Sequence, residues 1–172
     1  MLYLKCTTDV QKALGLTKAN LSEPEPSKAP LGHWYVNRFD LARHKALVFM
    51  SEPTLLSFIL YEGKKPLSPT TLPQMFLAGL SQLLLLRGFS QNVVEKAITP
   101  YHTGLFAKTD SRSALGSLND IVARYQWSVE GSGGLDSCDL TAIIMQANKA
   151  PQRRLGWDSA WNAVEAKLSK LS

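Results

Sequence analysis

Short runs of alternating or continuous apolar residues mark five segments of the chain, and this pattern is typical of β-strands. In the first run, Leu2 and Leu4 lie on one face of the expected strand, and Tyr3 and Lys5 lie on the other. The run "ALVFM" is apolar on both faces, which favours a central place in a sheet. We predict strands at residues 2–6, 33–39, 45–50, 55–61 and 104–108.

Apolar residues at helical spacing dominate the second half of the chain. Leu115, Leu118 and Val122, for example, are three and four residues apart, and Gly131 can end that helix. We predict main helices at residues 72–87, 91–99, 111–129, 139–148 and 159–170, and a short helix after the first strand. The segment 139–148 could instead be a strand, because "TAIIM" is rich in β-branched residues.

The order of these segments predicts the fold class. Strands come first and helices later, without regular alternation, which indicates an α+β fold with a small, mainly antiparallel sheet packed by helices. A chain of 172 residues is long enough for one complete core, so residues 1–172 are expected to form a single domain. The glycine-rich residues 131–135 are expected to be a flexible joint before a C-terminal helical segment.

Composition narrows the setting of the protein. Apolar residues make up 45% and charged residues 19% of the chain, as in ordinary soluble domains. No apolar run is long enough to span a membrane, and the N-terminus has no signal-peptide pattern. Cys6 and Cys138 are far apart in sequence, so we expect two reduced thiols in a cytoplasmic protein. The net charge of +5 permits an anionic partner.

Several kinds of catalytic or cofactor site are not indicated by the sequence. "GSGG" lacks the preceding strand and the Lys-Ser/Thr pair of a phosphate-binding loop. The histidines and cysteines are scattered singly, without the spacing of metal ligands, and Gly-x-Ser-x-Gly is absent. We therefore expect no metal and no cofactor, and we assign no catalytic residue.

Polar residues in the second predicted strand are the first candidate binding site. His33 and Asn37 share one face, while Trp34 and Arg38 share the other, where a guanidinium can stack on an indole. One interpretation is a packed sheet strand with a solvated end. The other is a row of polar groups that binds a ligand.

A basic tip follows this strand. Arg43, His44 and Lys45 lie where the turn between two strands is expected, and such a group can bind phosphates. Turns are commonly polar, so a solvated turn is the alternative interpretation.

The start of the helix at 111–129 is the second candidate site. Asp110 or Ser111 can cap this helix. A helix N-terminus with polar and basic residues can bind an anion, and the candidate residues are Arg112, Ser113, Asn119 and Asp120. Gly116 inside the helix indicates either a close neighbour or a ligand. The alternative interpretation is an ordinary capped helix with a solvated face.

The segment "NKAPQRRLGWDSAW" combines a basic pair with Leu-Gly-Trp. It resembles the tail of some insertion-sequence integrases, but the three separated metal-binding carboxylates of those enzymes cannot be identified here. The favoured interpretation is a structural turn with Trp157 packed on the last helix.

Three ordered motifs resemble a bacterial domain family of unknown function. They are Cys-Thr near the N-terminus, Leu-Gly-x-Trp-x-x-Asn from residue 31, and Arg-Ser-x-Leu-Gly-x-x-Asn-Asp from residue 112. Related segments are found joined to a plasmid-encoded protein family. The resemblance covers residues 1 to about 125, and it draws attention to Cys6, Trp34, Asn37, Arg112, Ser113, Asn119 and Asp120. It implies no activity, and His33 stands where the resemblance leads us to expect an acidic residue.

These observations favour a non-enzymatic binding module from a bacterial or mobile-element setting. It would contact nucleic acid or a protein partner through the sheet edge and the basic tip. The alternative is a toxin-like enzyme acting on RNA or a nucleotide, with His33 or His44 as general base and with Arg112 and Asn119 holding a phosphate. A third option is a partner-binding subunit marked by an exposed apolar patch. The sequence does not predict an oligomeric state.

Overall fold

Five strands form one mixed sheet in the computed structural model, which describes residues 1–64 and 66–171. The strands are β1 (Leu2–Cys6), β2 (Trp34–Leu41), β3 (His44–Ser51), β4 (Ser57–Tyr61) and β5 (Gly104–Lys108). Their spatial order is β4-β3-β2-β1-β5. The pairs β2–β3 and β3–β4 are antiparallel, whereas β1 pairs in parallel with both β2 and β5.

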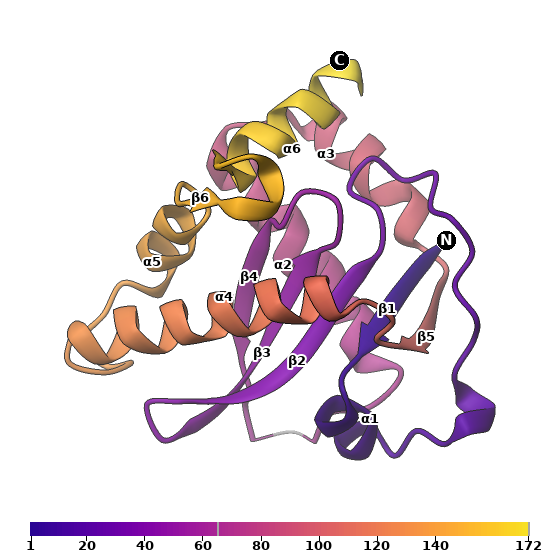
Figure 1. The fold of residues 1–172 in the computed structure, drawn as a ribbon, viewed down its shortest axis with the longest axis horizontal. Coiled ribbons are helices and arrows are strands. Elements are labelled where there is room, and N and C mark those ends of the chain that lie inside the picture. The colour runs from indigo at the N-terminus through magenta and orange to yellow at the C-terminus, as the bar shows by residue number, and fades with distance from the viewer. Residues whose placement is uncertain (65, 172) are drawn as a thin grey trace.

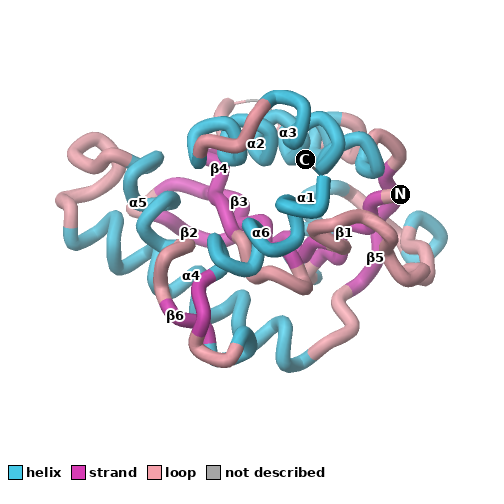
Figure 2. The backbone as a smooth tube through the Cα atoms, turned by 90° about the horizontal axis from the view of Figure 1, so that it is seen from above, coloured by secondary structure: helices cyan, strands magenta, loops and turns pink. Residues whose placement is uncertain are grey.

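Six helices accompany the sheet. They are α1 (Thr8–Leu14), α2 (Thr71–Arg87), α3 (Gln91–Ile98), α4 (Arg112–Gly131), α5 (Leu140–Ala147) and α6 (Ala160–Leu168). A two-stranded ribbon of β6 (Pro151–Gln152) and β7 (Asp158–Ser159) joins α5 to α6. The long α4 runs across the sheet in Figure 1, while Figure 2 shows α2 and α3 on the other side of it.

The alternation of side chains along β2 explains the two layers of helices. Trp34 and Val36 belong to the larger apolar cluster, which also contains residues of α1, α2, α3 and α6. Tyr35 and Phe39 belong to the second cluster, which α4 closes. The Trp34 indole N–H donates to the Tyr101 hydroxyl at 3.1 Å, so the one polar atom of this buried side chain has a hydrogen-bond partner.

The predicted α+β domain is confirmed, and each of the five predicted strands is present with shifts of one or two residues at some ends. The expectation of a mainly antiparallel sheet holds for β2, β3 and β4 only. The connections β1 to β2 and β4 to β5 each contain helices, which permits the parallel pairs. Residues 140–147 form a helix, so the alternative of a strand at this place is wrong.

The glycine-rich segment after α4 is folded into a turn. The Gly134 backbone N–H donates to the Val129 carbonyl at 3.0 Å, and both Gly133 and Gly134 have positive φ. Motion of this joint stays a prediction. Within the described residues, no helix combines the length and the hydropathy that a membrane span requires.

Candidate functional site

The tip of the β2–β3 hairpin is a two-residue turn whose basic side chains are partly paired. Ala42 and Arg43 both have positive φ, at 47° and 71°. The Lys45 ammonium lies 2.7 Å from the Asp40 carboxylate across the hairpin. The His44 ring contacts the Tyr61 ring edge-on at 5.1 Å between centroids. Arg43 is therefore the tip cation that forms no ion pair within the described residues.

The polar row of β2 is largely occupied by internal contacts. Trp34 is fully buried, and the Arg38 guanidinium binds both carboxylate oxygens of Glu62, at 2.7 and 3.0 Å. Asn37 accepts a hydrogen bond from the Thr7 hydroxyl at 2.7 Å. The polar contacts of Arg38 and Asn37 connect β2 with neighbouring parts of the chain. Trp34 cannot contact a ligand, because its side chain is fully buried.

The first turns of α4 leave four candidate side chains exposed: Arg112, Ser113, Asn119 and Asp120. Ser111 is the cap, because its hydroxyl accepts from the Ala114 backbone N–H at 3.1 Å. A Cβ placed on Gly116 would meet nothing within 4 Å. Gly116 therefore marks no close neighbour, and these exposed side chains line none of the depressions described below.

His33 lies at the start of β2, in a depression of about 550 Å³ on the α4 side of the sheet. The loop from Pro24 to Ser27 forms one wall, and Glu52 and Asp110 lie opposite Lys5. Three strands meet at this place, because Lys5 and Tyr35 are partners across β1 and β2 and Asp110 follows β5.

Lys5 connects the two carboxylates that line the depression. Its side chain is only 5% exposed, and its ammonium donates to Glu52 at 2.8 Å and to both Asp110 oxygens at 2.9 and 3.1 Å. The Tyr35 hydroxyl also donates to Asp110, at 2.6 Å. A buried lysine is stable as a cation only when carboxylates compensate its charge, and two carboxylates do so here.

The network shifts the titration of its members. Burial alone would lower the pKa of Lys5, but the hydrogen bonds to Glu52 and Asp110 outweigh it and raise that pKa. Burial would raise the pKa of Asp110, yet the bonds from Tyr35 and Lys5 lower it. Lys5 is therefore held as a cation and Asp110 as an anion, which is the opposite of what a lysine nucleophile needs.

His33 carries an unmet hydrogen-bonding group. The residue is 7% exposed, its ring meets Tyr3 edge-on, and its Nε2 contacts the Glu25 carbonyl oxygen. A carbonyl only accepts, so Nε2 carries the proton in the neutral ring and Nδ1 is an acceptor. This buried Nδ1 has no hydrogen-bond partner among the described residues.

A second site, which we call the basic–aromatic surface, surrounds the β6–β7 ribbon beside α4. Arg124 of α4 and Lys149 line one hollow of about 350 Å³, and Arg153 and Arg154 follow β6 directly. The same elements carry two exposed indoles, Trp127 on α4 and Trp157 in the ribbon turn. The surface therefore consists of Arg124, Trp127, Lys149, Arg153, Arg154 and Trp157.

The ribbon turn holds Trp157 away from the core. Gly156 and Trp157 both have positive φ, and the Trp157 backbone N–H donates to the Gln152 carbonyl at 2.9 Å. The Trp157 side chain is 67% exposed, and Trp127 is 79% exposed. The expectation that Trp157 packs on the last helix is therefore wrong, because most of its side chain is exposed to solvent.

Cations of this surface are free of ion pairs within residues 1–64 and 66–171. The four basic side chains have no carboxylate partner there, and the Arg124 Nη1 atom is buried without a hydrogen-bond acceptor. The ribbon's own carboxylate, Asp158, accepts from the Ser159 N–H and the Asn162 amide instead. The surface is consequently positive.

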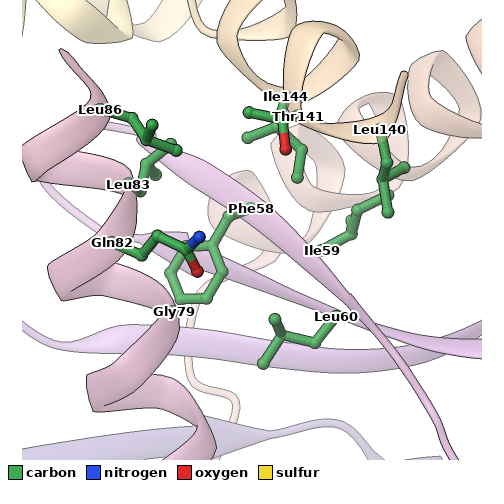
Figure 3. A pocket seen from close by; sticks show the side chains of 10 residues that line it. All are labelled: Phe58, Ile59, Leu60, Gly79, Gln82, Leu83, Leu86, Leu140, Thr141 and Ile144. Atoms are coloured by element: carbon green, nitrogen blue, oxygen red, sulfur yellow. The ribbon is translucent and has the colours of Figure 1, made fainter.

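An apolar groove of about 170 Å³ lies between α2, β4 and α5 (Figure 3). Leu83 and Leu86 of α2 face Leu140 and Ile144 of α5 across it, and Phe58 lies at its floor beside Gly79. Only uncharged side chains line this groove. It is therefore better suited to contact with an apolar partner than to catalysis.

The two cysteines remain free thiols. Cys6 is fully buried in β1, and burial raises the pKa of its thiol to about 12. Such a thiol is protonated at neutral pH and unreactive. The described part of the chain also contains no group of three His, Cys, Asp or Glu side chains that could hold a metal ion.

Sequence reasoning identified His33 but not the charged residues around it. Lys5 was visible as a single charge inside the apolar run "LYLKC", which is a signal for a buried partner. Asp110 was expected as a possible helix cap, whereas it binds Lys5 and Tyr35. Glu52 gave no signal, because its role depends on a contact 47 residues away.

The model of one protein family matches residues 3–163, and its description is a domain of unknown function, DUF6933. The match covers nearly the whole chain, so the protein belongs to this family. No curated protein matches the chain.

Proposed function

We propose that this member of the DUF6933 family is a non-enzymatic binding module for single-stranded nucleic acid, and that the basic–aromatic surface is its contact face. One observation carries the proposal: α4 and the ribbon segment carry four cations without ion pairs within the described residues and two exposed tryptophans. Cations neutralise phosphates, and indoles stack on unpaired bases of any sequence. Single strands suit this combination better than duplexes, whose bases are already stacked.

The overall charge agrees with this partner. The chain carries 19 Lys and Arg against 14 Asp and Glu. Several cations elsewhere are neutralised by carboxylates, for example Lys5, Arg38 and Lys45. The four cations of the ribbon surface are not neutralised in this way within the described residues. This difference favours the ribbon over the hairpin tip, where Lys45 is paired with Asp40.

The enzyme alternative receives less support from the geometry. His33 lines the depression around Lys5, but Arg112 and Asn119 lie on the exposed side of α4 and do not line it. A phosphate clamp made of these three residues would require them to converge. A protein partner is a further alternative, for which the apolar groove of Figure 3 is the matching surface.

The test is a set of anisotropy titrations with labelled single strands of about 20 nucleotides, both RNA and DNA, and with a duplex of equal length. We expect the single strands to bind more tightly than the duplex, and binding to weaken as salt rises. The double variant Arg153→Ala/Arg154→Ala should reduce the salt slope by about 1.4, which is roughly 0.7 for each lost phosphate contact. Trp157→Ala should weaken binding roughly tenfold, while Trp157→Phe should retain most of it.

The matched control removes the same charge from the hairpin tip with Arg43→Ala/Lys45→Ala. Loss of binding in this control, with the ribbon variant unaffected, would transfer the contact to the tip. Absence of binding by every strand at low salt would overturn the proposal altogether. Shortened strands on a denaturing gel would favour the enzyme instead.

A further inference from the structure

The depression around Lys5 has the chemistry of a ligand site, and Arg154 is the one residue that it shares with the basic–aromatic surface. Its central cation is already fully used, because the three donors of the Lys5 ammonium meet three carboxylate oxygens. Lys5 therefore cannot hold an anionic ligand. It fixes the two carboxylates in place instead.

The carboxylates keep free acceptor capacity on the open side. Glu52 and Asp110 are 29% and 47% exposed, and the Glu52 Oε1 atom has no hydrogen bond within the described chain. Each carboxylate can accept about four hydrogen bonds. Glu25 adds an exposed third carboxylate to the wall, so carboxylates outnumber the two cations, Lys5 and Arg154, that also line the depression.

His33 provides an independent indication of the same preference. Its side chain is more than nine-tenths buried, it lines the depression, and its Nδ1 acceptor lacks a donor among the described residues. Protein folds rarely leave a buried acceptor unmet unless another molecule meets it. The unmet atoms of His33 and Glu52 at this site are therefore hydrogen-bond acceptors, which a ligand with N–H donors would satisfy.

We propose that this depression binds an organic cation that carries several N–H donors, such as an alkylguanidinium or an alkylammonium group. Glu52 and Asp110 accept its hydrogen bonds and balance its charge, with Glu25 at the rim. His33 Nδ1 accepts a further N–H from a ligand that enters beside the wall of residues 24–27. The same group could come from a free metabolite or from an arginine side chain of a peptide, and the probes below separate these sources.

The experiment is calorimetric titration of the full chain with agmatine, with a short acetylated and amidated peptide containing one arginine, and with tetramethylammonium. The last probe has the charge but no N–H donor. We expect agmatine or the peptide to bind and tetramethylammonium not to bind. Agmatine binding without peptide binding would indicate a free small molecule, and the reverse would indicate a peptide side chain.

Two variants assign the binding to the depression. Glu52→Gln should weaken the binding of the active probe at least tenfold. Glu25 lies on an exposed loop and forms no hydrogen bond with Lys5, so Glu25→Gln should leave folding unchanged and still weaken binding several-fold. Equal binding heats for agmatine and tetramethylammonium would overturn the proposal. The same holds if neither Glu25→Gln nor a correctly folded Glu52→Gln variant weakens binding. Arg153→Ala, which changes the nucleic-acid surface, serves as the control and should leave cation binding intact.

Discussion

At the scale of single residues, two helical glycines have opposite surroundings. A Cβ on Gly79 of α2 would lie 2.6 Å from the Phe58 ring, whereas a Cβ on Gly116 of α4 would meet nothing within 4 Å. The Phe58 ring cannot move aside easily, because it stacks on Phe49 and Phe76 and is almost fully buried. Gly79 is thus a packing requirement, while Gly116 only weakens its helix.

The pair gives opposite predictions for the same substitution. Gly79→Ala should lower the free energy of unfolding by about 1–3 kcal/mol, because it overpacks the core. Gly116→Ala should raise it by up to about 1 kcal/mol, because alanine is the better helix former. Urea denaturation of both variants measures the difference. A stabilised Gly79→Ala variant would show that α2 and β4 can separate without cost.

At the scale of elements, the β2–β3 hairpin carries backbone strain at its turn. Two residues, Ala42 and Arg43, join the paired Leu41 and His44, and both turn residues have positive φ. Two-residue hairpins favour this conformation because it matches the twist of the strands, and Asn-Gly is its preferred sequence. The chain has neither residue here, so the pairing of the long strands holds the turn in place.

Replacing the turn residues should therefore stabilise the protein. We expect Ala42→Asn/Arg43→Gly to raise the free energy of unfolding by roughly 1–2 kcal/mol, because it relieves left-handed strain. Arg43→Ala removes the same charge and keeps a side chain with positive φ, so it should leave stability nearly unchanged. Thermal denaturation compares the two. Equal effects of both variants would assign the change to charge rather than to the backbone.

At the scale of the whole molecule, the Lys5 network joins three distant parts of the chain. Lys5 contacts Glu52, 47 residues away, and Asp110, 105 residues away. These contacts connect β1 with the β3–β4 turn and with the start of α4. Tyr35 links the network to the second apolar cluster, because its ring belongs to that cluster and its hydroxyl donates to Asp110.

The network makes the free energy of unfolding depend on pH in both the acidic and the alkaline range. The lowered pKa of Asp110 adds stability above its ordinary value of 3.8, and this contribution is lost as the pH falls through the folded pKa. The raised pKa of Lys5 adds stability below its ordinary value of 10.5, and this contribution is lost as the pH rises through the folded pKa.

Lys5→Met tests this role of the network. It should lower the free energy of unfolding at neutral pH by about 3 kcal/mol, since it leaves two carboxylates together without their cation. It should also reduce the loss of stability on acidification, because the pKa of Asp110 is then less depressed. Urea denaturation at neutral and acidic pH measures both effects. Lys12→Met, at an exposed lysine of α1, is the control and should change little.

The sequence by itself determined the type and order of the main elements, because hydrophobic periodicity is a local property of the chain. The five strands and the helices from α2 onward could be predicted from the spacing of apolar residues such as Leu115 and Leu118. His33 could be singled out as a polar residue in an apolar setting. Each of these inferences needed only a short window of sequence.

Only the tertiary structure decided how these elements meet. The parallel pairing of β1 with β2 and β5, the joining of Lys5 to Glu52 and Asp110, and the outward turn of Trp157 depend on the path of the whole chain. No local pattern indicates which residues far apart in sequence will meet. Such contacts close long loops of the chain, and the packing of the complete core decides which loops close. The sequence therefore predicted the elements and the fold class, whereas the residues that surround His33 could be identified only from the tertiary structure.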